Sequence, residues 1–275
     1  MGMTGSGKST FASRLATSGT QPIGIGNTLS SKTTEIAFYE TSSTKNRRVL
    51  LADTPGFDDT SRPDTSILQS ITLPLFEKHK NGIPVIGIIY LHDITNPRLS
   101  GSAVKALKIL QDFCGKENYP RIVFATTMWQ DAGYSPQGEI AARRRHAELK
   151  RDFWDAMFEG NGGVLCHLVD EAGSARKVVD HLLDGVDALR WGDRDRPLKV
   201  LREMGGNACI EKTAAYRCAQ GEQRLAVQLQ GQRREKREGG EREQRGDELL
   251  AYRHEDCPSL WVVFKGYLRQ RFATR

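Results

Sequence analysis

The first nine residues of the chain have the residue types and the spacing of a phosphate-binding loop. The stretch GMTGSGKS (residues 2–9) fits the pattern G-x-x-x-x-G-K-[S/T]. In such a loop the backbone N–H groups point inward, glycines allow positive φ, and the following helix adds its positive end. The lysine contacts phosphates and the hydroxyl residue holds Mg²⁺. The pattern therefore predicts phosphate contacts from Gly2, Thr4, Gly5, Ser6, Gly7, Lys8, Ser9 and Thr10.

A second motif supports this prediction. Asp53 ends the apolar run in LLADTPGFDD (residues 50–59), and Gly56 follows three residues later, which gives D-x-x-G. An acid at a strand end can hold the water shell of Mg²⁺, and a glycine N–H can meet the terminal phosphate. Release of the loop when that phosphate leaves would be a switch. Taken alone, the motif also fits a simple exit from a strand into a turn.

Strand-like and helix-like stretches alternate up to about residue 186, which predicts an α/β chain with right-handed crossovers and a mostly parallel sheet. We expect a three-layer phosphate-loop fold over residues 1–186 and a helical, charged, partly disordered extension over 187–275. The predicted strands are 35–41, 47–53, 83–93, 121–127 and 163–170, and the predicted helices are 8–16, 66–79, 100–114, 138–158 and 174–183.

Composition narrows the class of protein. The chain has 275 residues, 38% hydrophobic and 27% charged, with no apolar run long enough to cross a bilayer and no secretory signal. Its five cysteines are scattered, which argues against structural zinc and against a disulfide framework. We therefore expect a cytoplasmic protein with reduced thiols.

The net charge of +6 arises entirely after residue 189. Residues 230–250 are almost all charged, Gln and Gly, which predicts a solvated helix or disorder. Residues 258–272 are both apolar and basic, so they either dock on the domain or contact a membrane surface or partner, and docking is favoured. A nucleic-acid partner is not favoured, because the tail carries acidic as well as basic residues.

Three stretches together, GMTGSGKSTF, DTPGFDDT and YLHDITNPRLSGSAVKALKIL, resemble the G domains of GIMAP (immune-associated nucleotide-binding) and septin-related GTPases. They are most similar to G-domain proteins common in fungi. The resemblance covers about residues 1–186 and does not reach the tail. It implies GTP and GDP as ligands, Mg²⁺ as cofactor, and an option of a homodimer through the G domain.

The resemblance also implies roles for single residues. The switch-one threonine that completes the Mg²⁺ site with Ser9 and Asp53 is Thr33, with Thr34 as the alternative, and the catalytic set is Lys8, Thr33 and Gly56. Asp131 in TTMWQD takes the guanine-reading role, although Trp129 stands where such GTPases carry lysine. The indole either stacks on the base or packs against the following helix. Val169 and Asp170 would lie near the base.

Three further positions bear on catalysis and oligomer formation. Phe57 follows the glycine of D-x-x-G where a glutamine would orient the attacking water, so intrinsic hydrolysis is expected to be slow. Asp58 and Asp59 either assist or cap the next helix. His92 and Asp93 end a predicted strand at the carboxyl edge of the parallel sheet, where functional residues often lie. His92 is either a hydrogen-bonded loop histidine, which is the favoured interpretation, or a contact to the nucleotide of a dimer partner.

The resembling proteins carry an apolar strand directly before the loop. The first strand is therefore expected to be missing from this sequence, with two sheet edges left unpaired and with weakened folding and nucleotide affinity. The sequence predicts a GTP-binding protein and slow Mg²⁺-dependent GTPase that serves as a switch or an assembling scaffold. An ATP-using phosphate-loop enzyme and a non-catalytic nucleotide-binding or interaction module remain as alternatives.

Overall fold

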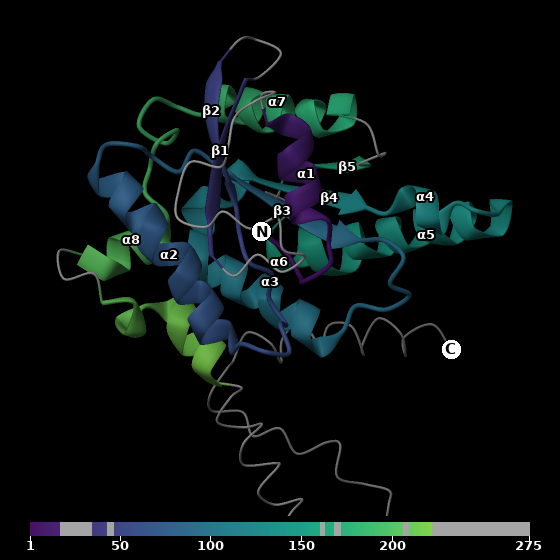
Figure 1. The fold of residues 1–275 in the computed structure, drawn as a ribbon, viewed down its shortest axis with the longest axis horizontal. Helices are drawn as coiled ribbons and strands as arrows, with labels where there is room; N and C mark the ends of the chain where they lie inside the picture. Colours follow the sequence, from purple (N-terminus) through teal and green to yellow (C-terminus); the bar gives the residue numbers. More distant parts are fainter. Residues whose placement is uncertain (17–34, 43–46, 160–162, 168–171, 206–208, 222–275) are drawn as a thin grey trace, which may run out of the picture. The chain divides into compact units, whose positions relative to one another are not determined.

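The structure is a computed structural model that describes residues 1–16, 35–42, 47–159, 163–167, 172–205 and 209–221. All of these belong to one compact unit, which runs from Met1 to Leu225 (Figure 1). The second unit, residues 226–275, lies outside the described residues, and so do the two tail segments discussed above.

The described strands form two separate sheets. β1 (Ala37–Ser42) and β2 (Arg48–Asp53) are an antiparallel pair, while β3 (Ile88–Asp93), β4 (Ile122–Thr127) and β5 (Gly163–His167) are parallel in the order β3-β4-β5. All five predicted strands are therefore present. The expected single, mostly parallel sheet is not seen among the described strands, because β2 and β3 do not pair with each other.

The strand predicted over residues 83–93 begins only at Ile88, which pairs with Ile122. Pro84 has no N–H to donate to a neighbouring strand. A Cβ on Gly87 would lie 2.6 Å from the side chain of Leu182, so α7 approaches the backbone closely at this point. An apolar run thus need not pair along its whole length.

Helices connect the strands and begin where the sequence provides caps. Ser100 and Ser135 accept hydrogen bonds from the N–H groups of Ala103 and Gly138 in the first turns of α3 and α5. The helices are α1 (Lys8–Leu15), α2 (Asp64–Lys80), α3 (Gly101–Cys114), α4 (Trp129–Ala132), α5 (Pro136–Glu148), α6 (Asp155–Met157), α7 (Ala172–Ala188) and α8 (Lys199–Met204), with a π-helical turn at Leu149–Trp154 and 3₁₀ turns at Lys116–Arg121 and Ile210–Lys212.

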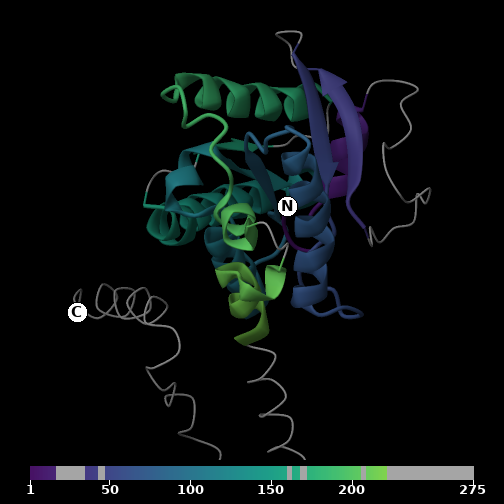
Figure 2. The ribbon, with the colours of Figure 1, turned by 90° about the vertical axis from the view of Figure 1, so that its left-hand side faces the viewer.

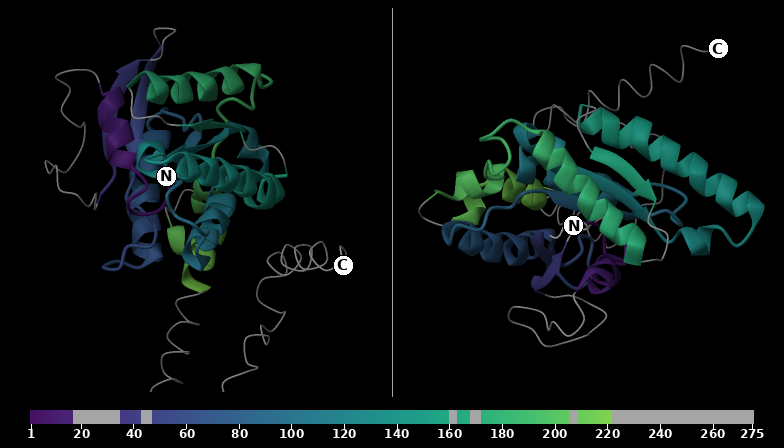
Figure 3. Two further views of the ribbon diagram at one scale, coloured as in Figure 1. Left: turned by 90° about the vertical axis from the view of Figure 1, so that its right-hand side faces the viewer. Right: turned by 90° about the horizontal axis from the view of Figure 1, so that it is seen from above.

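Two hydrophobic clusters cover opposite faces of the parallel sheet. The larger cluster joins α2, α3 and α8 to β3 and β4 through side chains such as Tyr90 and Phe124. The smaller cluster joins α1 and α7 to the other face through Leu91, Val123 and Ala125. Figures 2 and 3 show α7 lying along the strands on this second side. The side chains of β3 and β4 therefore alternate between two buried environments, as in a sheet covered on both faces.

Part of the predicted extension packs against the domain. Arg121 is almost fully buried and donates hydrogen bonds to the carbonyl oxygens of Val85, Arg194 and Arg196. Further along, Leu198, Val200, Leu201, Met204, Ile210, Ala215 and Ala219 are buried in the larger cluster. The buried guanidinium thus holds the chain between α7 and α8 on the domain.

Residues 1–3 lie between the two sheets. Gly2 forms a parallel bridge with Leu91 of β3, and Met3 forms a parallel bridge with Phe57, which follows β2. The Met1 ammonium donates to the Ile89 carbonyl at 2.7 Å, and the Leu91 N–H donates to the Met1 carbonyl at 2.9 Å. Burial, with a smaller contribution from Lys8, lowers the pKa of this amine to about 5.

Acetylation of the Met1 amine is expected to reduce the rise of stability with pH between pH 6.5 and 8. The unfolded amine has a pKa near 8.0 and the folded amine one near 5, so the unfolded chain binds more protons in this interval and stability rises with pH. His92, whose pKa falls from 6.5 to about 4, adds to the slope near the lower end of this interval, and Lys8, whose pKa falls from 10.5 to about 8, adds to it near the upper end, equally in both forms.

Urea unfolding of the free and acetylated chains across this interval measures the effect, with the amino terminus verified by mass spectrometry. Equal pH slopes for the two forms would contradict burial of the amine.

Candidate phosphate-binding site

The loop of residues 2–7 has the backbone conformation that its glycines predict. Gly2, Gly5 and Gly7 have φ values of 141°, 82° and 81°, a region that side chains other than glycine rarely adopt. Gly7 is the N-cap of α1 and gives no side-chain cap to the helix. The first N–H groups of α1 are therefore available to an anion, and the helix dipole favours negative charge there.

The loop is tied to the D-x-x-G segment by backbone hydrogen bonds. The Thr4 N–H donates to the Phe57 carbonyl at 2.9 Å, and the Phe57 N–H donates to the Gly2 carbonyl at 3.2 Å. The Thr4 hydroxyl donates to the same Phe57 carbonyl at 3.2 Å. The two motifs, more than 40 residues apart in sequence, thus form one unit.

Gly56 packs directly against the loop. A Cβ at this position would lie 2.6 Å from both the Cα and the N of Thr4, a distance that no real side chain tolerates. Phe57 next to it is 1% exposed and belongs to the larger cluster. The phenylalanine therefore anchors the segment in the core, and its ring has no group that could orient a water molecule.

Lys8, Ser9 and Asp53 interact at the start of α1. The Lys8 ammonium donates to the Met3 carbonyl at 2.7 Å, which closes the loop, and burial lowers its pKa to about 8. Burial also raises the pKa of Asp53, while the hydrogen bond from Ser9 and the charge of Lys8 oppose this shift. Each buried charge is thus partly offset by the other.

Some buried polar atoms next to the loop have no hydrogen-bond partner within the described part of the chain. They are one carboxylate oxygen of Asp53 and the hydroxyls of Ser6 and Thr54. Leaving such groups unsatisfied costs on the order of 1–3 kcal/mol each. A hydrated Mg²⁺ and a phosphate chain would supply partners, so the oxygen-rich set of Ser9 and Asp53 fits this ion.

The segment after β4 reaches the same edge of the sheet. The Thr127 hydroxyl lies 3.2 Å from the carbonyl oxygens of both Ser6 and His92, and the Thr127 and Met128 side chains approach Gly7. Asp131 lies in α4 with an exposed side chain. The structure thus brings the Asp131 segment next to the loop.

Trp129 packs against the following helix α5. Its indole N–H donates to the Thr126 hydroxyl at 2.9 Å, and its ring centre lies 5.8 Å from that of His146. This is the second of the two interpretations that the sequence left open. In this arrangement the indole N–H is occupied by the protein itself.

A hollow of about 220 Å³ lies beside the loop, on the side of the β3–α3 connection. His92 is 6% exposed, with its pKa lowered to about 4 by burial, so it is neutral near pH 7. Asp93 accepts hydrogen bonds from the Thr95 N–H and hydroxyl. Arg98 also lines the hollow. The sequence analysis did not identify this residue, because the only signal for it was its position five residues after the end of β3.

Asp58 and Asp59 do not cap α2 directly, since Pro63 is its N-cap. Asp58 accepts a hydrogen bond from Ser102 at 2.8 Å, and Asp59 accepts from the Ser61 N–H and hydroxyl. Thr10 lies exposed in the first turn of α1. Thr33, Thr34, Val169 and Asp170 lie outside the described residues.

Comparison with solved structures finds similar chains, of which one is described here. It is Toc33 from Arabidopsis thaliana in complex with Mg²⁺ and GMPPNP, at 16% sequence identity and a TM-score of 0.48, with 67% of this chain and 82% of that chain covered. A similarity at this level does not identify a function. No family model and no curated protein matches the chain. In the described residues, no helix is both long enough and apolar enough to span a bilayer.

The Gly56→Ala substitution is expected to lower the free energy of unfolding by about 1–3 kcal/mol, because the new methyl group overlaps the Thr4 backbone. Gly185→Ala in α7 is the matched control, since nothing lies within 4 Å of the added methyl group. Alanine in a helix interior should raise stability by up to about 1 kcal/mol. Urea unfolding measures both, and a neutral Gly56→Ala would contradict the close packing of the two motifs.

Proposed function

We propose that the chain binds GTP and GDP with Mg²⁺ and hydrolyses GTP slowly. The observation that carries this proposal is the loop of residues 2–8. Its glycines have positive φ, it leads into an uncapped helix N-terminus, and it lies beside Lys8 and the buried Asp53. Together these groups offer a phosphate chain several N–H donors and a cation in one place.

Ser9 and Asp53 are the described residues that would hold Mg²⁺, and Thr33 is the further ligand that we propose. The bound ion would neutralise charge on the phosphate oxygens. Lys8 already lies against the loop through the Met3 carbonyl, so its ammonium needs only a short movement to contact a phosphate oxygen. Gly56 contributes its backbone N–H and, by lacking a side chain, lets the segment lie against Thr4.

Asp131 is the group proposed to read the base. A carboxylate can accept hydrogen bonds from both the ring N–H and the exocyclic amine of guanine, whereas adenine offers no such pair of donors on that edge. The hydrogen bond between Thr127 and Ser6 fixes the segment relative to the phosphate loop. Residues 1–186 would thus form the G domain.

Slow hydrolysis follows from Phe57, which is buried in the core and cannot orient water. The hydrogen bonds between Thr4 and Phe57 give a route by which loss of the terminal phosphate could release the D-x-x-G segment. We therefore propose a switch or an assembling scaffold of the GIMAP and septin-related class, with a homodimer through the G domain as the form that completes the site.

The Lys8→Ala variant should bind a fluorescent GTP analogue about 10- to 100-fold more weakly, since a hydrogen bond to a charged group contributes about 1.5–3 kcal/mol. Lys150→Ala, which removes an exposed lysine of the π-helical turn, is the matched control and should bind normally. Circular dichroism would verify that both variants fold. Normal binding by a folded Lys8→Ala variant would rule out the loop as the phosphate site.

The Asp131→Asn variant should lose affinity for GTP by about 10- to 100-fold and gain affinity for xanthosine triphosphate, because the amide can donate to the carbonyl that replaces the exocyclic amine. Asp195→Asn, at an exposed site, is the control. Displacement of a bound fluorescent GTP analogue by GTP, ATP and XTP measures the order of the three affinities in each variant. Displacement by ATP as strongly as by GTP would instead favour an ATP-using enzyme.

A further inference from the structure

One carboxylate in the hollow beside the phosphate loop takes no part in the nucleotide contacts proposed above. Asp58 lines this hollow of about 220 Å³ together with Thr4 and Ser6 of the loop and with Ser100 before α3. Ser6 is 1% exposed, and its hydroxyl has no hydrogen-bond partner in the described part of the chain. The hollow therefore brings an acidic side chain that closely follows the D-x-x-G motif next to the place proposed for the phosphates.

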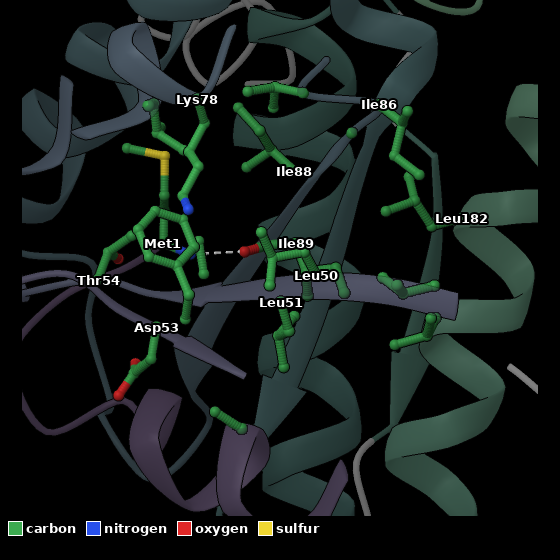
Figure 4. Close-up of a pocket in the computed structure, with 18 of the residues that line it drawn as sticks. Met1, Leu50, Leu51, Asp53, Thr54, Lys78, Ile86, Ile88, Ile89 and Leu182 are labelled. Carbon is green, nitrogen blue, oxygen red and sulfur yellow. Dashed lines mark hydrogen bonds between the residues drawn. The ribbon is translucent and has the colours of Figure 1, made fainter. Parts of the chain in front are cut away.

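A larger cavity, of about 310 Å³, lies between β2 and β3 (Figure 4). Apolar side chains make up most of its wall, and Asp53, which we assign to Mg²⁺, is its only acidic residue among the described ones. Neither Asp58 nor Thr4 lines this cavity. A water molecule that reacts at the phosphate loop is therefore better placed in the smaller, polar hollow.

The backbone of Asp58 is strained. Its φ of 62° lies in the left-handed region, which residues other than glycine adopt rarely. The Asp58 N–H donates to the Asp64 carboxylate at the start of α2 at 3.2 Å, and Lys105 of α3 contacts that same carboxylate at 2.9 Å. Strain of this kind persists only where neighbouring groups hold the residue, and it is common at active sites.

The Asp58 carboxylate is held through one of its two oxygens. Ser102 Oγ donates to Asp58 Oδ2 at 2.8 Å, and the same Oγ lies 2.9 Å from the hydroxyl of Ser100, the N-cap of α3. The described residues donate no hydrogen bond to Asp58 Oδ1. This oxygen can therefore accept a hydrogen bond from water while the other oxygen fixes the direction of the group.

Other groups around the hollow are less suited to orient a water molecule. Phe57 is buried and apolar. Both carboxylate oxygens of Asp93 already accept hydrogen bonds from the loop that follows it. His92 is 6% exposed and packs edge-on against Trp154. Asp58 is the remaining carboxylate of the hollow, and this residue is exposed.

The position of Asp58 fits attack on the terminal phosphate. Gly56, two residues earlier, is proposed to donate its N–H to that phosphate, and its backbone packs against Thr4. In-line attack requires a water molecule on the side of the γ-phosphorus that faces away from GDP. Because Thr4 and Asp58 share the hollow, a water molecule there lies next to both motifs.

We propose that Asp58 orients the attacking water and accepts its proton during hydrolysis of GTP, in the role that a glutamine has in other GTPases. This inference rests on the proposed GTP binding. The water oxygen forms a bond to the γ-phosphorus, while the bond from that phosphorus to the oxygen shared with the β-phosphate breaks and leaves its electron pair on GDP. The proton passes from the water to the Asp58 carboxylate and then to the inorganic phosphate.

The test is single-turnover hydrolysis of GTP labelled at the γ-phosphate and bound to the 275-residue chain with Mg²⁺. Asp58→Asn should hydrolyse GTP about 100-fold more slowly, the low end of what a general base contributes, and should bind GTP with unchanged affinity. Asparagine tolerates the left-handed backbone and keeps an oxygen for Ser102. Asp59→Asn is the matched control and should hydrolyse GTP normally, because Asp59 bonds to Ser61 and does not line the hollow.

Asp58→Gly keeps the test valid if asparagine disturbs the fold, because glycine adopts this φ without strain. This variant should bind GTP, hydrolyse it slowly, and regain part of the rate when formate is added as a replacement carboxylate. Hydrolysis at the unchanged rate by either variant would overturn the inference and leave the proposed GTP binding intact. Loss of GTP affinity in proportion to the rate would also overturn it, because the role of Asp58 would then be structural. A chain that binds no GTP would overturn the proposed function itself, and this inference with it.

Discussion

The structure depends on how residues 2–8 are held between two strands. The Thr4–Phe57 and Phe57–Gly2 hydrogen bonds tie the loop to the end of β2, and the parallel bridge between Gly2 and Leu91 ties it to β3. Gly56 allows these segments to meet because no side chain would fit against Thr4. The phosphate loop and the D-x-x-G segment take their relative position from this junction, so a change at Gly2 or Gly56 acts on both motifs.

The junction also sets the electrostatics of the site. Lys8 and Asp53 are both largely removed from water. Burial lowers the pKa of Lys8 and raises the pKa of Asp53, and both shifts favour the neutral form of the side chain. One carboxylate oxygen of Asp53 and the hydroxyls of Ser6 and Thr54 have no hydrogen-bond partner among the described residues. A site of this kind is costly without a ligand and becomes satisfied when phosphate oxygens and a hydrated cation enter. This links the stability of the fold to the ligand that we propose.

Local signals predicted much of the fold. The glycine spacing predicted the loop conformation, and apolar runs and helical patterns predicted the five strands and the main helices, although β3 begins five residues later than predicted. Tertiary features were beyond the sequence. The separation into two sheets, the packing of Trp129 against His146, and the packing of α8 through Arg121 all depend on contacts between segments that are apart in the sequence. The roles of Thr33 and Asp131, and the relation to GIMAP and septin-related proteins, stay predictions.

The central claim is that the backbone N–H groups of the loop surround a guanosine triphosphate. Amide hydrogen exchange of the chain, with and without Mg²⁺ and GTP, tests it at single residues. The account predicts strongly slowed exchange at Gly5, Gly7, Lys8 and Ser9 when GTP and Mg²⁺ are present, and a weaker effect with ATP. Unchanged exchange at these four residues, under conditions where GTP binds, would show that the phosphates lie elsewhere and would contradict the account.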